Sequence, residues 1–331
     1  MGEEAEFQWL IQCLISTEAL IYGVALVWEQ TFRKSKVWSK NCCFFVLKTG
    51  FSSFTSKSAK KITILHTNDV HSHIDAFGPE DGRNANQGGV ARRATLIESI
   101  RNENPNTLLL DAGDIFQGTP YFNYYGGELE FKLMSKLKYD AATIGNHDFD
   151  NGIDGLYAQL PHAKFQFISS NYDFKNTIMD THAKPYKVFV KDGIRIGVFG
   201  LGIELDGLVD KKMYKETVYL DPIETSQEMT RILKENEKCD LIICLSHLGY
   251  NYKEYAEKIS DLNLAKATKD IDLIIGGHTH TFLRKPTVVK NSINENMLVN
   301  QVGCYGINLG RIDFYFDSDK NKVANGTSII V

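Results

Sequence analysis

Five short polar clusters in this sequence carry side chains that can bind metal ions. Each follows a short apolar run, and the five are Asp69-Val70-His71, Gly113-Asp114, Gly145-Asn146-His147-Asp148, Ser246-His247 and Gly277-His278-Thr279-His280. The candidate ligands in them are two aspartates, one asparagine and four histidines: Asp69, Asp114, Asn146, His71, His247, His278 and His280. This mixed oxygen and nitrogen set suits zinc, manganese, iron or cobalt better than calcium, which prefers oxygen alone.

Seven ligands are too many for one tetrahedral ion. Two ions about 3.5 to 4 Å apart that share one carboxylate would use all of them, and such pairs hydrolyse phosphate esters. Two divalent ions bring four positive charges against the two negative charges of Asp69 and Asp114, which leaves the site positive for a phosphate dianion. The pattern therefore predicts phosphoester hydrolysis at a dinuclear centre.

The elements that must position these clusters have the pattern of an α/β domain. From Lys61 onward, β-branched and apolar runs alternate with amphipathic stretches. Ligands of open α/β sheets bind beyond the carboxyl ends of the strands, which is where each cluster falls. The predicted strands are residues 62–67, 107–112, 141–145, 165–170, 194–201, 240–246, 272–277, 297–302 and 307–316.

Three segments between these strands show the apolar spacing of helices. Apolar residues recur at steps of three and four over 90–100 and over 129–137. Asp221-Pro222 is typical of a helix start, with an aspartate cap and proline in the first turn, and this helix is predicted to end near Lys238. Near-continuous apolar strands such as 240–246 predict sheets that are covered on both faces.

The composition excludes several classes of protein. Lysine and arginine number 37 against 41 aspartates and glutamates, so there is no basic excess for a nucleic-acid polymer. A content of 43% hydrophobic residues supports a packed core and excludes a disordered chain. Six cysteines are too few for a disulfide scaffold, and Cys239 and Cys244 are predicted to face opposite sides of one strand without pairing.

The first sixty residues differ from the rest. Residues 7–28 form an apolar run about as long as a membrane span, followed by Arg33, Lys34, Lys36 and Lys40. Glu18 lies at its centre, however, and glutamates precede it where a signal peptide has positive charge. Residues 1–60 are predicted as an extension: either a signal anchor with membrane contact through 7–28 and a Ser/Lys-rich linker, or an amphipathic extension or mispredicted start.

The motifs resemble those of a known family. The matching segments are HTNDVHSH (66–73), GGVARRATLI (88–97), DAGDIFQGTP (111–120), TIGNHDFDNG (143–152) and IGGHTH (275–280). They are similar to the calcineurin-like metallophosphoesterases and, within them, to the 5'-nucleotidase family. Over residues 61–331 this implies a metallophosphatase domain: a four-layer α/β/β/α sandwich of two mixed sheets flanked by helices. It also implies two divalent ions, of zinc, manganese, magnesium, cobalt or iron, and nucleotide hydrolysis by a metal-activated water.

The resemblance assigns a role to each matching position. The first metal would be held by Asp69, His71 and His280, and the second by Asn146, His247 and His278, with Asp114 bridging the two. His147 and Asp150 match the catalytic dyad, in which the histidine stabilises the transferring phosphoryl group and protonates the leaving alkoxide. Asn146 and His147 are also the predicted substrate-binding residues. Asp148 is either a hydrogen-bond acceptor behind the ligands or a helix-start acid.

The substrate is less determined than the chemistry. Family members of the 5'-nucleotidase type carry a C-terminal substrate-binding domain, which is not expected here because the sequence ends at Val331. Such a domain could act in trans as a separate chain. The alternatives are a broad-specificity or cyclic-nucleotide phosphodiesterase, and a metal-binding subunit that depends on that separate chain. Related enzymes are mostly exported, so the cell envelope or periplasm is the expected location. The aromatic residues that could either stack on a base or pack in the core are Tyr121, Phe122, Tyr124 and Tyr125.

Overall fold

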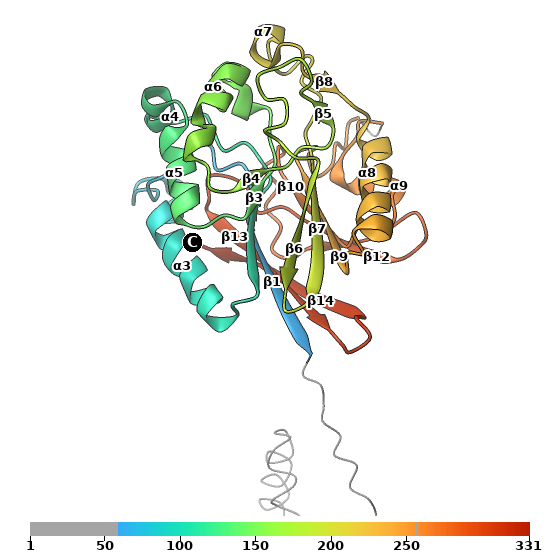
Figure 1. The fold of residues 1–331 in the computed structure, drawn as a ribbon. Coiled ribbons are helices and arrows are strands. Elements are labelled where there is room, and N and C mark those ends of the chain that lie inside the picture. Colours follow the sequence, from blue (N-terminus) through green and yellow to red (C-terminus); the bar gives the residue numbers. More distant parts are fainter. Residues whose placement is uncertain (1–58, 256) are drawn as a thin grey trace, which may run out of the picture. The chain divides into compact units, whose positions relative to one another are not determined.

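The structure is a computed structural model that describes residues 59–255 and 257–331. The predicted membrane-contacting segment, 7–28, lies outside the described residues. Two mixed six-stranded sheets pack face to face at the centre of the described part (Figure 1). Among the helices of this part of the chain, none has the length and apolar character that a membrane crossing needs.

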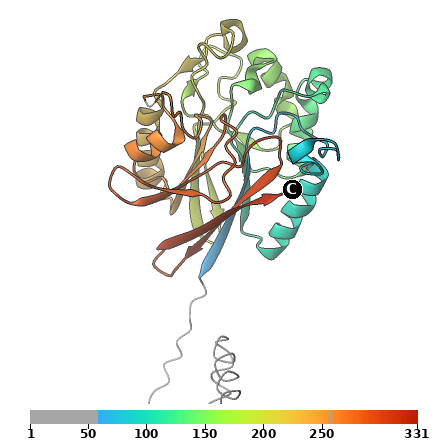
Figure 2. The same ribbon diagram turned by 180° about the vertical axis from the view of Figure 1, so that it is seen from behind.

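The first sheet has the strand order β14-β13-β1-β2-β3-β4. β1 runs parallel to β2 and antiparallel to β13, and Figure 2 shows the blue β1 beside the red C-terminal strands. The strands of this sheet are β1 (Lys60–Thr67), β2 (Thr107–Asp111), β3 (Ala141–Ala142), β4 (Gln166–Phe167), β13 (Asn308–Phe316) and β14 (Lys322–Ile330).

The second sheet has the order β11-β12-β10-β9-β7-β6, in which β7, β9, β10 and β12 are parallel. Its strands are β6 (Tyr186–Lys191), β7 (Ile194–Leu201), β9 (Leu241–Ser246), β10 (Leu273–Gly276), β11 (Thr287–Lys290) and β12 (Asn296–Asn300). A separate short pair is formed by β5 (Tyr172–Asp173) and β8 (Val218–Tyr219).

Helices cover the outer face of each sheet. α3, α5 and α6 lie on the first sheet, and α8 and α9 lie on the second (Figure 1). The helices are α3 (Val90–Glu103), α4 (Pro120–Tyr125), α5 (Glu128–Lys136), α6 (Gly152–Gln159), α7 (Lys211–Tyr214), α8 (Pro222–Arg231) and α9 (Asp261–Ala267), and the short turns are η1 (Gly82–Asn84), η2 (His147–Phe149), η3 (Leu160–His162) and η4 (Ile232–Asn236). The predicted four-layer sandwich is confirmed.

The central strands bury side chains on both faces. Ile64 of β1 and Ile243 of β9 belong to the core between the sheets, whereas Leu65 and Ile242, one position along, pack under the helices. Because successive side chains alternate in a strand, burial on both faces requires the continuous apolar runs that the sequence shows. Each fully buried leucine or isoleucine contributes about 1.5 to 3 kcal/mol.

The predicted helix at Asp221 is also present. The Asp221 carboxylate accepts a hydrogen bond from the Glu224 backbone N–H at 2.8 Å and caps α8, whose last turn continues as the π-helical η4. The predicted helices over 90–100 and 129–137 correspond to α3 and α5. Cys239 and Cys244 are unpaired, as predicted, but they do not face opposite sides of one strand. Cys239 precedes β9, and both cysteines are buried in the core under the helices of the second sheet.

Candidate metal centre

The predicted ligands come from loops that follow strands of both sheets. Asp69 follows β1, Asp114 follows β2 and Asn146 follows β3, all in the first sheet. His247 follows β9, and His278 and His280 follow β10, in the second sheet. The carboxyl ends of these parallel strands meet at one edge of the sandwich, so all of the predicted ligands converge there.

One cluster contains Asp69, His71 and His280, whose ligand atoms lie within 4.8 Å of one another. The two histidines face each other with their Nε2 atoms 3.0 Å apart, and His280 Nε2 is 3.4 Å from Asp69 Oδ1. Metal–nitrogen bonds of about 2.0 to 2.1 Å would separate two ligand nitrogens of one ion by about 3 Å. The donor set and its spacing therefore fit a divalent transition metal or zinc.

A second cluster contains Asp114, His247 and His278, again within 4.8 Å of one another. His247 Nε2 is 3.0 Å from Asp114 Oδ2, but without the alignment of a hydrogen bond, and this fully buried nitrogen has no hydrogen-bond partner among the described residues. A ring nitrogen and a carboxylate oxygen that approach each other in this way can both bind a cation placed between them. Asn146 joins this cluster, because its Oδ1 is 2.9 Å from His278 Nδ1.

The two clusters adjoin each other at Asp114. Its Oδ2 atom, beside His247 in the second cluster, is also 3.8 Å from His71 Nε2 in the first. Asp69 Oδ1 similarly lies 3.9 Å from His247 Nε2. The arrangement is consistent with a dinuclear site in which one carboxylate reaches both ions, the role that the resemblance implies for Asp114.

Backbone carbonyls set the orientation of two of the ligand rings. His71 Nδ1 lies 3.0 Å from the Phe116 carbonyl oxygen, and His247 Nδ1 lies 2.7 Å from that of Ala112. A ring nitrogen that donates its proton to a carbonyl leaves the lone pair on Nε2, which faces the cluster. Both rings are thus prepared to bind a metal through Nε2.

Asp148 holds the ligand loops together from behind. Its fully buried carboxylate accepts hydrogen bonds from four backbone N–H groups, those of Asp114, Ile115, Phe116 and Gly145, at 2.8 to 3.2 Å. Of the two interpretations that the sequence left open, the structure favours the acceptor behind the ligands. Burial, together with the Asp114 carboxylate, raises the pKa of Asp148 to about 7.

The ligand loops use backbone conformations that L-residues rarely adopt. A positive φ, between 47° and 71°, occurs at five of the candidate ligands: Asp69, His71, Asp114, His278 and His280. Each such residue costs about 1 to 2 kcal/mol, and their concentration at one place is typical of a functional site. Gly145 belongs to the same packing, because a Cβ there would clash with Asp114 Oδ1.

The carboxylates dominate the electrostatics of the clusters. Burial alone would lower the pKa of His247, but the charge of Asp114 raises it to about 10. A hydrogen bond with Asp69 raises the pKa of His280 to about 10. Burial instead lowers the pKa of His278 to about 4. Cations are therefore strongly favoured beside Asp69 and Asp114, and a metal ion that binds there releases protons from the histidines.

His147 and Asp150 form a pair at the border of the clusters. His147 Nδ1 lies 3.1 Å from Asp150 Oδ2, and both side chains are about one third exposed, at 33% and 31%. The ring centroid of His147 is 5.3 Å from that of His71, and its backbone N–H donates to Asp114 Oδ1 at 2.8 Å. The pair is therefore open to a substrate at the clusters.

Among the described residues, none of the four aromatic residues considered as a stacking surface makes a ring contact with a ligand histidine. Phe122 is buried in the core and stacks on Phe116, whereas Tyr124 is 82% exposed and Tyr121 donates to Asp75 Oδ2. The aromatic ring that borders the first cluster is Tyr305, 6.0 Å from the His71 ring and 5.9 Å from the His280 ring. Tyr305 was not predicted from the sequence, although it follows the predicted strand 297–302 just as the ligands follow theirs.

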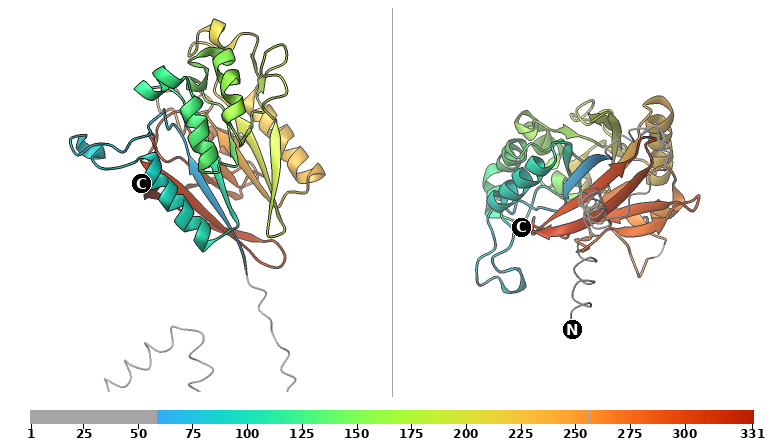
Figure 3. Two further views of the ribbon diagram at one scale, coloured as in Figure 1. Left: turned by 60° about the vertical axis from the view of Figure 1, so that its left-hand side comes forward. Right: turned by 90° about the horizontal axis from the view of Figure 1, so that it is seen from below.

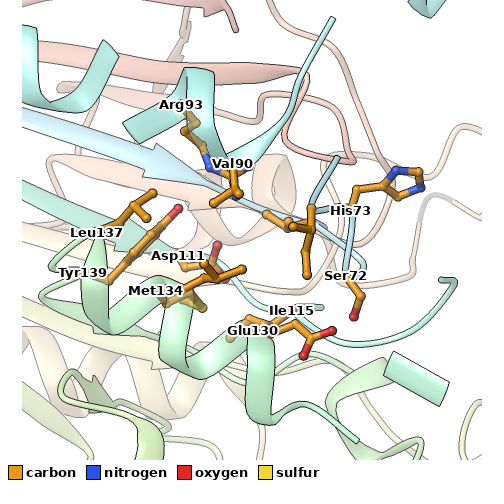
Figure 4. A pocket seen from close by; sticks show the side chains of 13 residues that line it. Ser72, His73, Val90, Arg93, Asp111, Ile115, Glu130, Met134, Leu137 and Tyr139 are labelled. Carbon is orange, nitrogen blue, oxygen red and sulfur yellow. The ribbon is translucent and has the colours of Figure 1, made fainter. Parts of the chain in front are cut away.

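A small buried cavity of about 30 Å³ lies behind the first ligand loop (Figure 4). Its lining includes Arg93 of α3, Glu130 of α5, and Asp111 and Tyr139 between them. Arg93 Nε and Nη1 and both Glu130 carboxylate oxygens have no hydrogen-bond partner among the described residues. A cavity of this size has room for one or two waters, which such polar groups favour. Burial raises the pKa of Asp111 to about 7.

Comparison with known proteins gives a consistent set of relatives. A family model described as "Calcineurin-like phosphoesterase" matches residues 62–282. The trifunctional nucleotide phosphoesterase YfkN of Bacillus subtilis is 36% identical over 77% of this chain, which covers 18% of YfkN. The snake venom 5'-nucleotidase of Crotalus adamanteus is 33% identical over 82% of this chain.

A solved structure agrees with these relatives. The 5'-nucleotidase precursor from Thermus thermophilus matches with a TM-score of 0.74 and 33% identity, over 82% of this chain and 55% of that one. The chain spans about half the length of the venom enzyme, 48%, and a smaller share of YfkN.

Proposed function

Because the chain belongs to the calcineurin-like phosphoesterase family, we propose that it is a metal-dependent hydrolase of the 5'-nucleotidase type, which releases phosphate from nucleotides. The observation that carries the proposal is the position of Asp114 between two clusters, with the His147–Asp150 pair beside them. The names of the relatives, a nucleotide phosphoesterase and 5'-nucleotidases, favour nucleotides as the substrate class.

The clusters provide the charge that phosphoester hydrolysis needs. Two divalent ions held by Asp69, His71 and His280 and by Asp114, Asn146, His247 and His278 would neutralise the phosphoryl oxygens and activate the attacking water. The backbone conformations of the ligand loops and the four hydrogen bonds to Asp148 fix these residues before a substrate arrives. Such preorganisation is the main electrostatic contribution of a protein to this kind of reaction.

His147 is placed to serve the leaving group. Its Nδ1 is engaged by Asp150, which leaves Nε2 for the oxygen of the ester bond. Although burial opposes it, the Asp150 hydrogen bond and the charge of Asp114 raise the pKa of His147, so the ring keeps its proton to a higher pH than a free histidine. As the water oxygen bonds to phosphorus and the ester bond breaks, that proton passes to the leaving alkoxide.

The test is phosphate release by the full chain with added manganese or zinc. The panel is AMP, UMP, 2',3'-cyclic AMP, UDP-glucose, bis(p-nitrophenyl) phosphate and p-nitrophenyl phosphate. We expect the highest kcat/KM for a nucleoside monophosphate. Faster cleavage of the diesters would indicate a phosphodiesterase instead, and two bound ions without any hydrolysis would indicate a metal-binding subunit that needs a separate substrate-binding chain.

A further inference from the structure

A groove of about 720 Å³ lies beside the first cluster. Its walls are the η1 loop, the segment that follows His280, the loop of Cys304 and Tyr305, and the last part of β14. Figure 3 shows the η1 loop projecting next to the C-terminal end of β14, and the Gly88 N–H donates to the Val331 carbonyl oxygen at 2.8 Å. The volume is within the range of small-molecule sites, about 300 to 1,000 Å³.

The charged side chains of this groove are all cations. Arg83, Arg284 and Lys285 line it and are exposed, and no aspartate or glutamate is among its described lining residues. None of the three cations forms an ion pair within residues 59–255 and 257–331, whereas Arg195, Arg231 and Arg311 each have a carboxylate within 4 Å. Unpaired cations that converge on one cavity favour an anionic ligand.

The groove also offers an aromatic face. The Phe282 ring packs against Gly303, where a Cβ would clash with the ring, and the residue is still 51% exposed. One face of the ring is thus supported by the backbone while the rest remains free to stack on a planar group. Tyr305 forms the end of the groove nearest to His71 and His280.

We propose that this groove is a leaving-group subsite, which binds an aromatic ring together with a phosphate other than the one hydrolysed. The proposal rests on the proposed function, because the scissile phosphate would lie at the clusters on the other side of Tyr305. Phe282 would stack on the base, and Arg83, Arg284 and Lys285 would bind the additional phosphate. The substrate class is therefore a nucleotide with a second phosphate, for which adenosine 3',5'-bisphosphate is a suitable probe.

The kinetic test compares three substrates that lose one feature at a time: adenosine 3',5'-bisphosphate, AMP and p-nitrophenyl phosphate. The Arg284→Ala/Lys285→Ala double variant should raise KM about tenfold or more for the bisphosphate, with much less effect on AMP and none on p-nitrophenyl phosphate. Phe282→Ala should raise KM for both adenosine substrates. Lys136→Ala/Lys266→Ala is the matched control, because it removes two exposed lysines from α5 and α9, outside the groove.

A binding measurement separates this proposal from the proposed function. In the presence of a chelator, saturation-transfer NMR on the adenine protons reports contact with the full chain without turnover. We expect a saturation-transfer signal from adenosine 3',5'-bisphosphate with the unchanged protein. This signal should fall at least threefold with the Arg284→Ala/Lys285→Ala variant and should not fall with the control. If all three substrates are hydrolysed but binding of the bisphosphate does not depend on Arg284 and Lys285, the subsite proposal is wrong and the proposed hydrolase function stands. If binding depends on these residues but no substrate is hydrolysed, the subsite stands and the proposed function is wrong.

Discussion

His147 differs from the other histidines of the metal centre in the carboxylate that its ring contacts. The histidines of the two clusters lie beside Asp69 or Asp114, whereas the His147 ring bonds to Asp150, outside both clusters. The ring can therefore be changed without removing a candidate ligand side chain. This separates catalysis from metal binding in a single substitution.

We expect His147→Asn to lower kcat about 100-fold or more, because the leaving alkoxide would lose its proton donor. The metal content of the purified variant, measured by mass spectrometry, should equal that of the unchanged protein. His182→Asn is the control, since His182 is exposed and its ring packs against Tyr157, away from the ligand loops in the sequence. Full turnover by the His147 variant would refute the role of the pair.

His66 makes the stability of the fold depend on pH. This fully buried side chain accepts a hydrogen bond from Asn300 Nδ2 at 2.8 Å, and burial lowers its pKa from 6.5 to about 3. Between these two pH values the unfolded chain binds a proton that the folded chain does not. Stability is therefore fully present above pH 6.5 and is lost as the pH falls toward 3.

His66→Gln should remove this part of the pH dependence. As the pH falls from about 6.5 to 4, we expect the free energy of unfolding to decrease faster for the unchanged protein than for the variant. The two slopes should differ by up to about 1.4 kcal/mol per pH unit. Urea titrations in the presence of a chelator would measure it. Parallel pH profiles for the two proteins would contradict a neutral buried His66.

At the scale of elements, the sequence predicted the central strands well and the outer ones poorly. β2, β7, β9 and β10 consist mainly of apolar residues, and β1 has an apolar centre, because helices and the facing sheet cover both faces of these strands. Five strands were not predicted: the separate short pair β5 and β8, and three edge strands of the two large sheets, β6, β11 and β14. An edge strand is partly exposed and needs no continuous apolar run, as the sequence KVANGTSII of β14 illustrates.

The same division holds for the candidate site. The proposed ligands could be identified because a strand end fixes where a side chain lies along the chain and in the sheet. The pairing of His147 with Asp150 was instead implied by the resemblance to the family. The groove of Arg83, Arg284 and Phe282 could not, because it joins loops whose contacts no local pattern specifies. The left-handed backbone of Asp69 and His71 was equally hidden, since neither residue type requires it.

Gly145 links the strand end of β3 to the loop of Asp114. We expect Gly145→Ala to reduce metal binding to the second cluster at least about tenfold, because its methyl group would clash with Asp114 Oδ1 and displace that carboxylate. Calorimetric titration with manganese would measure the loss. Gly78→Ala is a control for the added methyl group, because the backbone of Gly78 is not left-handed and its Cβ would meet only Asp81 Oδ2, at 3.4 Å. Equal affinities for Gly145→Ala and the unchanged protein would show that the loop adapts.

At the scale of the whole molecule, the proposed ions would connect the two sheets. Each cluster draws ligands from both: Asp69 and Asp114 follow strands of the first sheet, and His247 and His280 follow strands of the second. The centre would therefore hold the two halves of the sandwich together as well as provide the chemistry. Its ligands come from two layers that also meet through apolar side chains and through polar contacts such as the His66–Asn300 hydrogen bond.

Metal binding should thus stabilise the entire domain. At a free metal concentration about 100 times Kd, one site adds about 2.7 kcal/mol, so we expect Tm to rise by several degrees with zinc or manganese and to fall again with a chelator. His280→Ala should retain only part of the increase, because it removes one ligand of the first cluster alone. A Tm that does not respond to either metal would contradict a centre that joins the sheets.

The division of the ligands along the chain also has a consequence for biosynthesis. Asp69, Asp114 and Asn146 leave the ribosome before His247 and His278, by on the order of ten seconds at ordinary rates of translation. Neither cluster has its full ligand set in that interval, which metal-binding assays on chains arrested before residue 247 would test. A nascent or prematurely terminated chain would thus contain no hydrolytic centre, and phosphate esters around the ribosome would meet activity only in finished molecules.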